Sequence, residues 1–372
     1  MNILKFQNER MVSLDVFRGI VILLLLAEGT GIYFLFYNVF SEVPILSSFS
    51  KQFFHAEWGG MHFWDLIQPY FTFIVGVAMV FSLKNRWERG DSWLMTFRHI
   101  LFRCSVLFFL GIILQSGYRE KLVWELWNIL TQLSFSILIV FLIFRFPVFI
   151  QIIFSLGLLF FTEMLYRYVS IDGFDYPFVK NRNFGTYIDL LLMGKTHPDG
   201  WVAFNCIPTT AHMIWGGLIG RVITGLNKPN HKIKTIGIGC LAALLVGYGL
   251  DWMGISPINK KISTSSFVIA SGGWCMGTFL LLYWLVDIKG YKNKKWINIF
   301  SIVGMNPIFI YVFSQTIGRG FLNEFVPIFT KGIMGRFTTS EGIMNFITYI
   351  TILIIEWYIC YWLYKRRIFI KV

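Results

Sequence analysis

Long apolar segments recur along the whole chain, and short polar segments separate them. A helix needs about 20 mostly apolar residues to cross the hydrocarbon core of a bilayer. Ten segments come near that length: 14–36, 62–83, 99–116, 128–145, 148–168, 202–222, 235–252, 265–286, 298–316 and 343–364. The pattern predicts an all-α, polytopic integral membrane bundle of about ten transmembrane helices, in a single domain over residues 1–372.

Lysine and arginine gather in every second connecting segment. With the N-terminus in the cytoplasm, the cytoplasmic segments hold these cations: Lys84, Arg86, Arg89, Arg98, Lys228, Lys232, Lys234, Lys289, Lys292, Lys294, Lys295, Lys365, Arg366 and Arg367. The long segments 37–61, 169–201 and 317–342 lie on the other side and mix fewer cations with acids. Because cytoplasmic loops carry the excess of Lys and Arg, we predict that both termini are cytoplasmic.

The composition agrees with lipid as the surrounding solvent. The chain is 56% hydrophobic, 19% aromatic and 14% charged, with a mean hydropathy of +0.62. A soluble domain carries about 25% charged residues, so water would not solvate this surface. The formal net charge of +13 would suit a nucleic-acid ligand, but the cations form short clusters between apolar segments. That arrangement is topogenic, and we expect no nucleic-acid partner.

The cysteines indicate neither disulfides nor a metal site. All five lie inside apolar segments: Cys104, Cys206, Cys240, Cys275 and Cys360. Their number is odd, and no CxxC or Cys/His pairing occurs, so we expect no zinc site. The first apolar segment begins near Phe17, and no small-x-small cleavage site follows it. We therefore expect a retained first helix, not a cleaved signal peptide.

Ionisable side chains inside apolar segments are the first candidates for chemistry, because they are costly at membrane depth. Asp15 and Arg18 are three residues apart, so they can pair on one helical face and anchor the helix at the interface. Glu28 lies more than two turns into the first segment, between Ala27 and Gly29. It needs a polar cavity or a partner such as His or Arg, and we consider it a site residue.

The segment 54–69, which leads into the second apolar segment, is the richest in polar groups. His55 and His62 sit at the expected boundary between water and membrane, where a neutral histidine can serve as a general base. Asp65 follows near the helix start and can orient a ring nitrogen. Glu57 and Trp58 lie between them. Interfacial histidines among aromatic residues are also often structural, and the spacing fits no tight metal-ligand set.

Further polar residues lie at the outer ends of the later helices in the same topology. They are Asp189, His197, Asp199, His212, Asp251, Lys260 and Lys261, with His212 inside the segment 202–222. We therefore expect a polar cavity toward the outer half of the bundle. The sequence contains no GxxxxGKS loop and no GxSxG elbow, so nothing indicates an ATPase or a serine hydrolase.

Several of these residues form motifs that are similar to a known family. Ser13-Leu14-Asp15-Val16-Phe17-Arg18-Gly19-Ile20 resembles the opening signature of the heparan-α-glucosaminide N-acetyltransferase family, transmembrane acetyltransferases related to the lysosomal enzyme. The other similar motifs follow in order: His55-Ala56-Glu57-Trp58-Gly59-Gly60 with Asp65-Leu66-Ile67-Gln68-Pro69, Tyr187-Ile188-Asp189 with Leu192-Met193-Gly194, Pro198-Asp199-Gly200, Pro257-Ile258-Asn259-Lys260, Gly304-Met305-Asn306-Pro307 with Tyr311, and Tyr364-Lys365-Arg366-Arg367-Ile368-Phe369. These motifs span nearly the whole chain, and their shared order makes the resemblance specific.

The resemblance implies a single transmembrane acyltransferase domain that takes the acetyl group from cytoplasmic acetyl-CoA. The acceptor would be the amine of a glucosamine-type sugar on the other face of the membrane. His55 occupies the position of the family's essential histidine. It would deprotonate the amine for direct attack on the thioester, or carry the acetyl group transiently. The basic cytoplasmic loops would suit the phosphates of coenzyme A, although topogenesis alone explains them equally.

The resemblance assigns expected roles to the candidates. The catalytic candidates are His55, Asp65 and Glu28, the substrate-binding candidates are Glu57, Trp58, His62, Asp189, Asn259, Lys260 and Asn306, and the cofactor-binding candidates are Arg18 and His212. No metal is expected. Gly216-x-x-x-Gly220 allows close helix packing within the chain or in a homodimer.

The chain departs from the family pattern at four positions. Glu28-Gly29 stands where the family usually has Asn, and Leu130-Thr131-Gln132 lacks the Arg of a Leu-Gln-Arg element. Ser263 replaces a Trp and Gly59 replaces an Asn. These differences leave the expected fold unchanged and bear on the identity of the acceptor. The N-terminal luminal region of the animal enzyme has no counterpart, so we expect a bacterial-type member in the inner membrane.

Two other functions are compatible with the same bundle. A cavity open to both faces would suit a sugar or oligosaccharide permease. Acyl transfer to another cell-envelope glycan would use the same residues with a different acceptor. Acetyl transfer that depends on His55 would distinguish the transferase from the permease.

Overall fold

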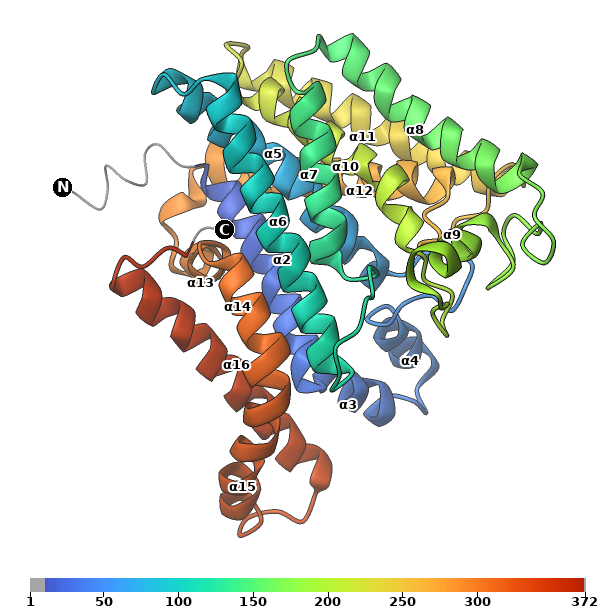
Figure 1. Ribbon diagram of the computed structural model, residues 1–372. Helices are drawn as coiled ribbons and strands as arrows, with labels where there is room; N and C mark the ends of the chain where they lie inside the picture. The colour runs from blue at the N-terminus through green and yellow to red at the C-terminus, as the bar shows by residue number, and fades with distance from the viewer. Residues whose placement is uncertain (1–10, 371–372) are drawn as a thin grey trace. The chain divides into compact units, whose positions relative to one another are not determined.

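The computed structural model describes residues 11–370, and every regular element within this range is a helix (Figure 1). The chain divides into two compact units. Among the described residues, unit 1 holds 11–54, 62–64 and 282–370, and unit 2 holds His55–Met61 and Asp65–Leu281. Unit 1 therefore joins the two ends of the chain, whereas unit 2 is nearly continuous. The single domain expected over 1–372 stays a prediction, and we describe each unit by itself.

Unit 2 contains the middle helices. They are α5 (Ile67–Glu88), α6 (Trp93–Tyr118), α7 (Ile129–Ile143), α8 (Val148–Tyr168), α9 (Phe184–Met193), α10 (Cys206–Thr224), α11 (Pro229–Trp252) and most of α12 (Ser265–Leu282). Local signals start several of them: the side chains of Ser92, Asn128 and Asn183 accept backbone N–H bonds at the first turns of α6, α7 and α9. Pro147 precedes α8 and Pro229 is the first residue of α11, where a missing N–H costs nothing. α6 and α7 pack side by side (Figure 1).

Unit 1 contains the first and last helices. They are α2 (Val12–Thr30), α3 (Ile32–Val39), α4 (Pro44–Lys51), α13 (Lys295–Gly304), α14 (Pro307–Phe313), α15 (Asn323–Met334) and α16 (Glu341–Lys365). Two π-helical segments occur here, η3 (Tyr283–Ile288) and η5 (Ser314–Leu322). Such wide turns are uncommon and frequently mark functional sites.

The predicted spans correspond to helices, but not all of them meet the requirements for crossing a membrane. Among the described residues, six helices are long and apolar enough, or up to eight if two bent pairs each form one span. The first pair, α2 and α3, bends by 70° at Gly31, and the second, α13 with Pro307–Met334, bends by 75°. α7 has only 15 residues, and α10 carries Thr209, Thr210, His212 and Arg221. The all-helical class is confirmed, whereas the count of ten and the cytoplasmic termini stay predictions.

Glycines allow very close helix pairs in both units. In unit 2, a Cβ on Gly76 would lie 2.1 Å from Met213 O on α10, and one on Gly216 would lie 2.1 Å from Phe73 O on α5. In unit 1, a Cβ on Gly19 of α2 would lie 1.8 Å from Phe300 O on α13, and one on Gly304 of α13 would lie 1.9 Å from Asp15 O on α2. Larger residues would push these backbones apart, because small residues are what permits such approach.

The Gly216-x-x-x-Gly220 motif is used within the chain. A Cβ on Gly220 would lie 3.0 Å from Val77 O, so both glycines of the motif face α5. The motif therefore explains the α5–α10 contact of unit 2 and gives no reason to expect a homodimer.

Several helices carry an apolar exterior. On α8 the exposed side chains include Phe149, Ile153 and Phe160, and on α11 they include Leu241 and Leu245. Contiguous apolar surface of this kind is rare on a soluble monomer and is stable in lipid. The helices thus agree with the sequence in indicating an integral membrane protein.

Candidate active site

The segment that carries His55 is a loop between α4 and α5 whose base is closed by hydrogen bonds. The side-chain oxygen of Gln52 accepts the backbone N–H of Phe63 at 3.0 Å, and Gln52 O accepts that of Trp64 at 2.9 Å. The Nδ1 atom of His62 lies 2.9 Å from Phe54 O. His62, a substrate-binding candidate, therefore has one ring nitrogen engaged with the backbone of its own loop.

His55 lies against a carboxylate and an ammonium group. Its Nδ1 atom is 2.8 Å from Asp65 Oδ1 and 3.2 Å from Lys260 Nζ, and Lys260 Nζ is 3.8 Å from Asp65 Oδ1. The second oxygen of Asp65 accepts the backbone N–H of Ala56 at 3.2 Å. The side chains of Asp65 and Lys260 are 1% and 6% exposed, whereas that of His55 is 38% exposed. The two charges are thus buried behind an imidazole that solvent can reach.

The shorter of the two contacts at Nδ1, the one with Asp65, favours one tautomer of His55. A carboxylate 2.8 Å from Nδ1 requires a proton on that nitrogen, because two lone pairs would otherwise face each other. Nδ1–H therefore donates to Asp65, and Lys260 balances the charge of the carboxylate. The lone pair of Nε2 is then left available for a base or a nucleophile, as in other carboxylate–histidine pairs.

The surroundings also keep His55 neutral. Burial lowers the pKa of His55, the positive charge of Lys260 lowers it further, and Asp65 opposes both, giving a pKa of about 4. At neutral pH the imidazole is consequently unprotonated and basic at Nε2, the state that general-base or nucleophilic catalysis requires.

Trp201 completes the cluster and was missed by the sequence analysis. Its ring makes an edge contact with His55 at 5.2 Å between centroids and lies 5.1 Å from Lys260 Nζ. It follows Gly200, whose φ of +80° and close approach to the Trp58 ring leave no room for a Cβ. Trp58 in turn donates from Nε1 to Phe178 O at 2.8 Å. The Pro198-Asp199-Gly200 motif was the available signal, since it predicts a turn that positions the next residue.

A second loop, between α11 and α12, brings Lys260 to His55. Asn259 is 2% exposed, and its Oδ1 accepts the backbone N–H groups of Lys261 and Ile262 at 2.9 and 3.3 Å. The backbone N–H of Gly60 donates to Ile258 O at 2.8 Å, which joins this loop to the His55 loop. Lys261 Nζ donates to the backbone oxygen of Glu57, whose own side chain points to solvent. Asn259 thus shapes the loop that presents Lys260.

Asp189 supports the site from α9. It is fully buried, accepts from Trp127 Nε1 at 2.7 Å through one oxygen, and accepts from the backbone N–H of Ala203 at 2.9 Å through the other. It therefore ties the α6–α7 connection to the start of α10. Both oxygens are occupied by protein donors, so a contact with substrate would have to displace one of them.

Three further candidates, Glu28, Arg18 and Asn306, lie in unit 1. Glu28 Oε2 accepts from Arg319 Nη2 at 2.6 Å, and Arg18 Nη1 lies 3.1 Å from Asp15 Oδ1, as their spacing predicts. Asn306 is buried and binds the backbone of Ile368 and Ile370, which anchors the C-terminal segment.

His212 is in unit 2 but away from solvent. Its side chain is fully buried, and Nε2 lies 3.0 Å from Val268 O and 2.9 Å from Ser271 Oγ on α12. These contacts join α10 to α12. The cofactor-binding role expected for His212, like that of Arg18, stays a prediction.

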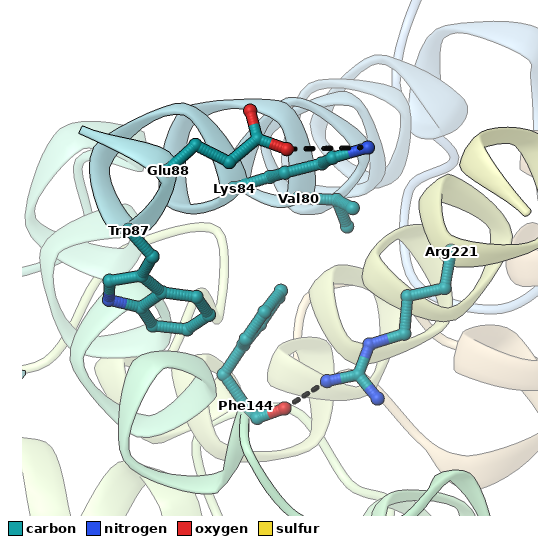
Figure 2. Close-up of a pocket in the computed structure, with 6 residues that line it drawn as sticks. All are labelled: Val80, Lys84, Trp87, Glu88, Phe144 and Arg221. Carbon is teal, nitrogen blue, oxygen red and sulfur yellow. Dashed lines mark hydrogen bonds and ion pairs between the residues drawn. The ribbon is translucent and has the colours of Figure 1, made fainter. Parts of the chain in front are cut away.

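A separate pocket lies at the other end of α5. It has a volume of about 450 Å³ and is lined by Val80, Lys84, Trp87, Glu88, Phe144 and Arg221. Figure 2 shows Lys84 beside Glu88, with 3.7 Å between their charged atoms, and the guanidinium of Arg221 donating to Phe144 O. α5 has 22 residues, so its length of about 33 Å separates this pocket from Asp65 along the helix. In the predicted topology the pocket faces the cytoplasm.

These observations define a class: a protein that is all-helical over residues 11–370, with six to eight candidate membrane spans in that range and a histidine–carboxylate–lysine cluster in its loops. No protein-family model matches the chain. The heparan-α-glucosaminide N-acetyltransferases of Mus musculus and Homo sapiens are 23% and 24% identical to it over 98% of its length. The chain spans about 60% of the length of these curated relatives, 61% of the mouse protein and 60% of the human one. It is distantly homologous to the heparan-α-glucosaminide N-acetyltransferase family.

Proposed function

We propose that this protein transfers an acetyl group from cytoplasmic acetyl-CoA to the amine of a glucosamine-type sugar on the outer side of a membrane. The proposal includes ten spans with both termini in the cytoplasm, and the inner membrane of a bacterium as the location. It is supported by the distant homology to membrane acetyltransferases and by the polar groups gathered around His55.

The observation that carries the proposal is the state of His55. Its Nδ1–H is held by Asp65, and its imidazole is neutral and partly exposed. In direct transfer, Nε2 takes a proton from the sugar amine while the amine nitrogen attacks the thioester carbonyl. The C–N bond forms, the C–S bond breaks, and the thiolate of coenzyme A takes up the proton as it leaves. The imidazolium formed on the way is stabilised by Asp65.

The same geometry allows a second route. Nε2 can attack the thioester carbonyl itself, which forms an acetyl-imidazolium whose Nδ1–H stays with Asp65 and breaks the C–S bond, so that coenzyme A leaves as the thiolate. The amine then attacks the acetyl carbon, the C–Nε2 bond breaks to regenerate neutral His55, and the proton that the amine loses balances the charge of the thiolate. Both routes need the tautomer that Asp65 selects.

The pocket at the other end of α5 supports a donor that arrives from the cytoplasm. Lys84 and Arg221 line it, and Arg145 lies over the Trp87 ring at 4.8 Å. The two lining cations and the nearby Arg145 outnumber the single lining carboxylate of Glu88, which suits an anionic ligand, and Arg and Lys are the usual partners of phosphate groups. We assign to this pocket the phosphates of coenzyme A when the donor is bound.

The experiment that tests this function measures transfer of labelled acetyl from acetyl-CoA to glucosamine by the purified protein. His55→Ala is expected to lower turnover by about 10²–10⁴-fold, the usual contribution of general acid–base catalysis. His231→Ala is the matched control, because His231 is exposed in the first turn of α11. Full activity of His55→Ala, with wild-type melting behaviour, would overturn the role of His55.

A sugar permease is the second candidate, and one observation favours it. Two helix pairs of unit 1 are bent by 70° and 75°, and broken helices are typical of the binding sites of transporters. Flux of labelled sugar into vesicles that contain the wild-type protein, without acetyl transfer to any amino sugar, would select this function. Transfer to a different envelope glycan would keep the transferase and change only its acceptor.

A further inference from the structure

A carboxyl group lies in the middle of the last helix, and the sequence analysis did not consider it. Glu356 is 15 residues from the start of α16 and 9 from its end, so it lies about 22 and 14 Å from the two ends. The helix is apolar around it and is one of the six candidate spans. Glu356 is 1% exposed. A carboxyl so placed is a functional candidate by default, because ionisable groups in spans usually serve ion pathways or proton relays.

The surroundings of Glu356 provide little compensation for a negative charge. Its side chain hydrogen-bonds to Ser314 of η5, and Oε2 has no hydrogen-bond partner. Gly318 permits this approach, since a Cβ there would lie 2.6 Å from Glu356 Oε1. An ionised carboxyl with one hydroxyl partner is very unfavourable in an apolar interior, whereas the neutral acid is not.

Arg319, which follows Gly318 in the chain, is already paired with Glu28. Arg319 donates to Glu28 Oε2 at 2.6 Å, and Asn323 donates to Gly29 O at 2.9 Å. Ser314 Oγ lies 3.1 Å from the position that a Gly29 Cβ would occupy and 3.3 Å from that of a Gly318 Cβ. The hydroxyl therefore lies between the end of α2 and Glu356. Two carboxyl groups thus flank a π-helical segment that carries a single arginine.

The ligand that fits this arrangement is a proton. Metal cations of the size of Na⁺ or Ca²⁺ require several oxygen ligands, and Glu356 with Ser314 offers too few. Among the described residues, no group of three His, Cys, Asp or Glu side chains is arranged to hold a metal ion. Protonation forms one O–H bond on Glu356 and takes its charge from −1 to 0, which removes the unfavourable buried charge.

We propose that Glu356 and Ser314 form a proton-binding site in unit 1, and that loss of the proton draws Arg319 from Glu28 toward Glu356. The π-helical segment is the element that responds, since it carries both Ser314 and Arg319. This site goes beyond the proposed acetyl transfer and does not rest on it, because all of its residues belong to unit 1.

Charged or titratable groups also occur on α16 and on the elements packed against it. They are Asp15, Arg18 and Glu28 on α2, Tyr33 and Tyr37 on α3, Lys295 on α13, Arg319 on η5, Glu324 and Lys331 on α15, and Glu341, Tyr349, Tyr358, Cys360, Tyr361, Tyr364 and Lys365 on α16. Of these, Glu28 and Arg319 adjoin Ser314 through Gly29, and they already neutralise each other.

Infrared difference spectroscopy between acidic and alkaline pH, on the purified protein in lipid nanodiscs, tests the site directly. The wild type is expected to show the C=O stretch of a buried carboxylic acid that disappears at alkaline pH. Glu356→Gln should remove this band, and Glu324→Gln, at an exposed position on α15, should retain it. A band that persists unchanged in Glu356→Gln would overturn the proposal.

Two further variants keep the proposal falsifiable if Glu356→Gln does not fold. Ser314→Ala leaves the carboxyl in place and should move the C=O band to higher frequency, because the hydrogen bond is lost. Arg319→Gln should move the disappearance of the band to higher pH, because a cation that stabilises the carboxylate is absent. An unchanged band in Ser314→Ala would refute the site, and an unchanged midpoint in Arg319→Gln would refute the exchange of partners.

Discussion

The two charged clusters of this protein differ in the kind of backbone structure that supplies their residues. His55, Asp65 and Lys260 come from loops and a short turn of unit 2, whereas Glu28, Arg319 and Glu356 come from the helices of unit 1. In the first cluster a buried ion pair supports a half-exposed ring. In the second, Glu28 and Arg319 retain some exposure, while the remaining carboxyl is enclosed.

This difference has a chemical consequence. A loop cluster with one accessible nitrogen can act on a molecule that arrives from outside, because its lone pair is not consumed by the protein. An enclosed carboxyl has no room for a substrate and can exchange only something as small as a proton. Substitutions around His55 should therefore change turnover and its pH profile, and substitutions at Glu356 should change proton binding. Glu28, which is also a catalytic candidate, tests whether the second cluster influences turnover.

The largest effect is expected for Asp65→Asn. The amide cannot hold Nδ1–H as the carboxylate does, so we expect turnover in acetyl transfer to fall by about 10²–10⁴-fold. It also leaves Lys260 buried without a counter-charge, which should lower the melting temperature. Adding Lys260→Met should recover stability without activity. Asp199→Asn, at an exposed position, is the control, and wild-type turnover in Asp65→Asn would contradict the arrangement.

Lys260→Met should move the acid limb of the pH–rate profile to higher pH. Lys260 lowers the pKa of His55 to about 4 together with burial, so removing this cation lets the pKa rise. A larger fraction of His55 is then protonated, and inactive as a base, at mildly acidic pH. Lys261→Met should cause a smaller shift, since its effect on His55 ranks last among the contributions. A limb that stays fixed or moves to lower pH in Lys260→Met would refute this account.

The smallest effect is expected for Glu28→Gln. The variant loses a charge-assisted hydrogen bond to Arg319, and about 1.5 kcal/mol corresponds to about a tenfold change in turnover. We expect this change in acetyl transfer without lower expression, as a site residue requires. Unchanged kinetics would make Glu28 a structural carboxylate and would mean that this ion pair has no influence on acetyl transfer.

Some features of the protein were accessible from local sequence. Each of the ten apolar segments corresponds to a helix or a bent pair of helices, because a run of apolar residues is a property of the chain itself. The pairing of Asp15 with Arg18 follows from helical periodicity in the same way. The motif that contains His55 likewise drew attention to a residue that lies between Asp65 and Lys260 in the structure.

Other features depended on contacts between distant parts of the chain. Lys260 is 205 residues from His55, and no periodicity relates the two loops that bring them together. Trp201 contacts His55 because the turn at Gly200, the residue before it, packs against the Trp58 ring. The signal for Glu356 was present as a carboxyl in an apolar segment, but its open oxygen and its Ser314 partner appear only when α16 packs against η5.

The sequence by itself thus determined which segments are helical and apolar, because helix formation and hydropathy are local properties. The tertiary structure alone decided which charges meet, because a buried charge is stable only beside a partner that folding supplies. It also decided which atoms keep their chemistry available: Asp65 engages Nδ1 of His55 and not Nε2, and the second oxygen of Glu356 is among the buried atoms of the described residues without a hydrogen-bond partner.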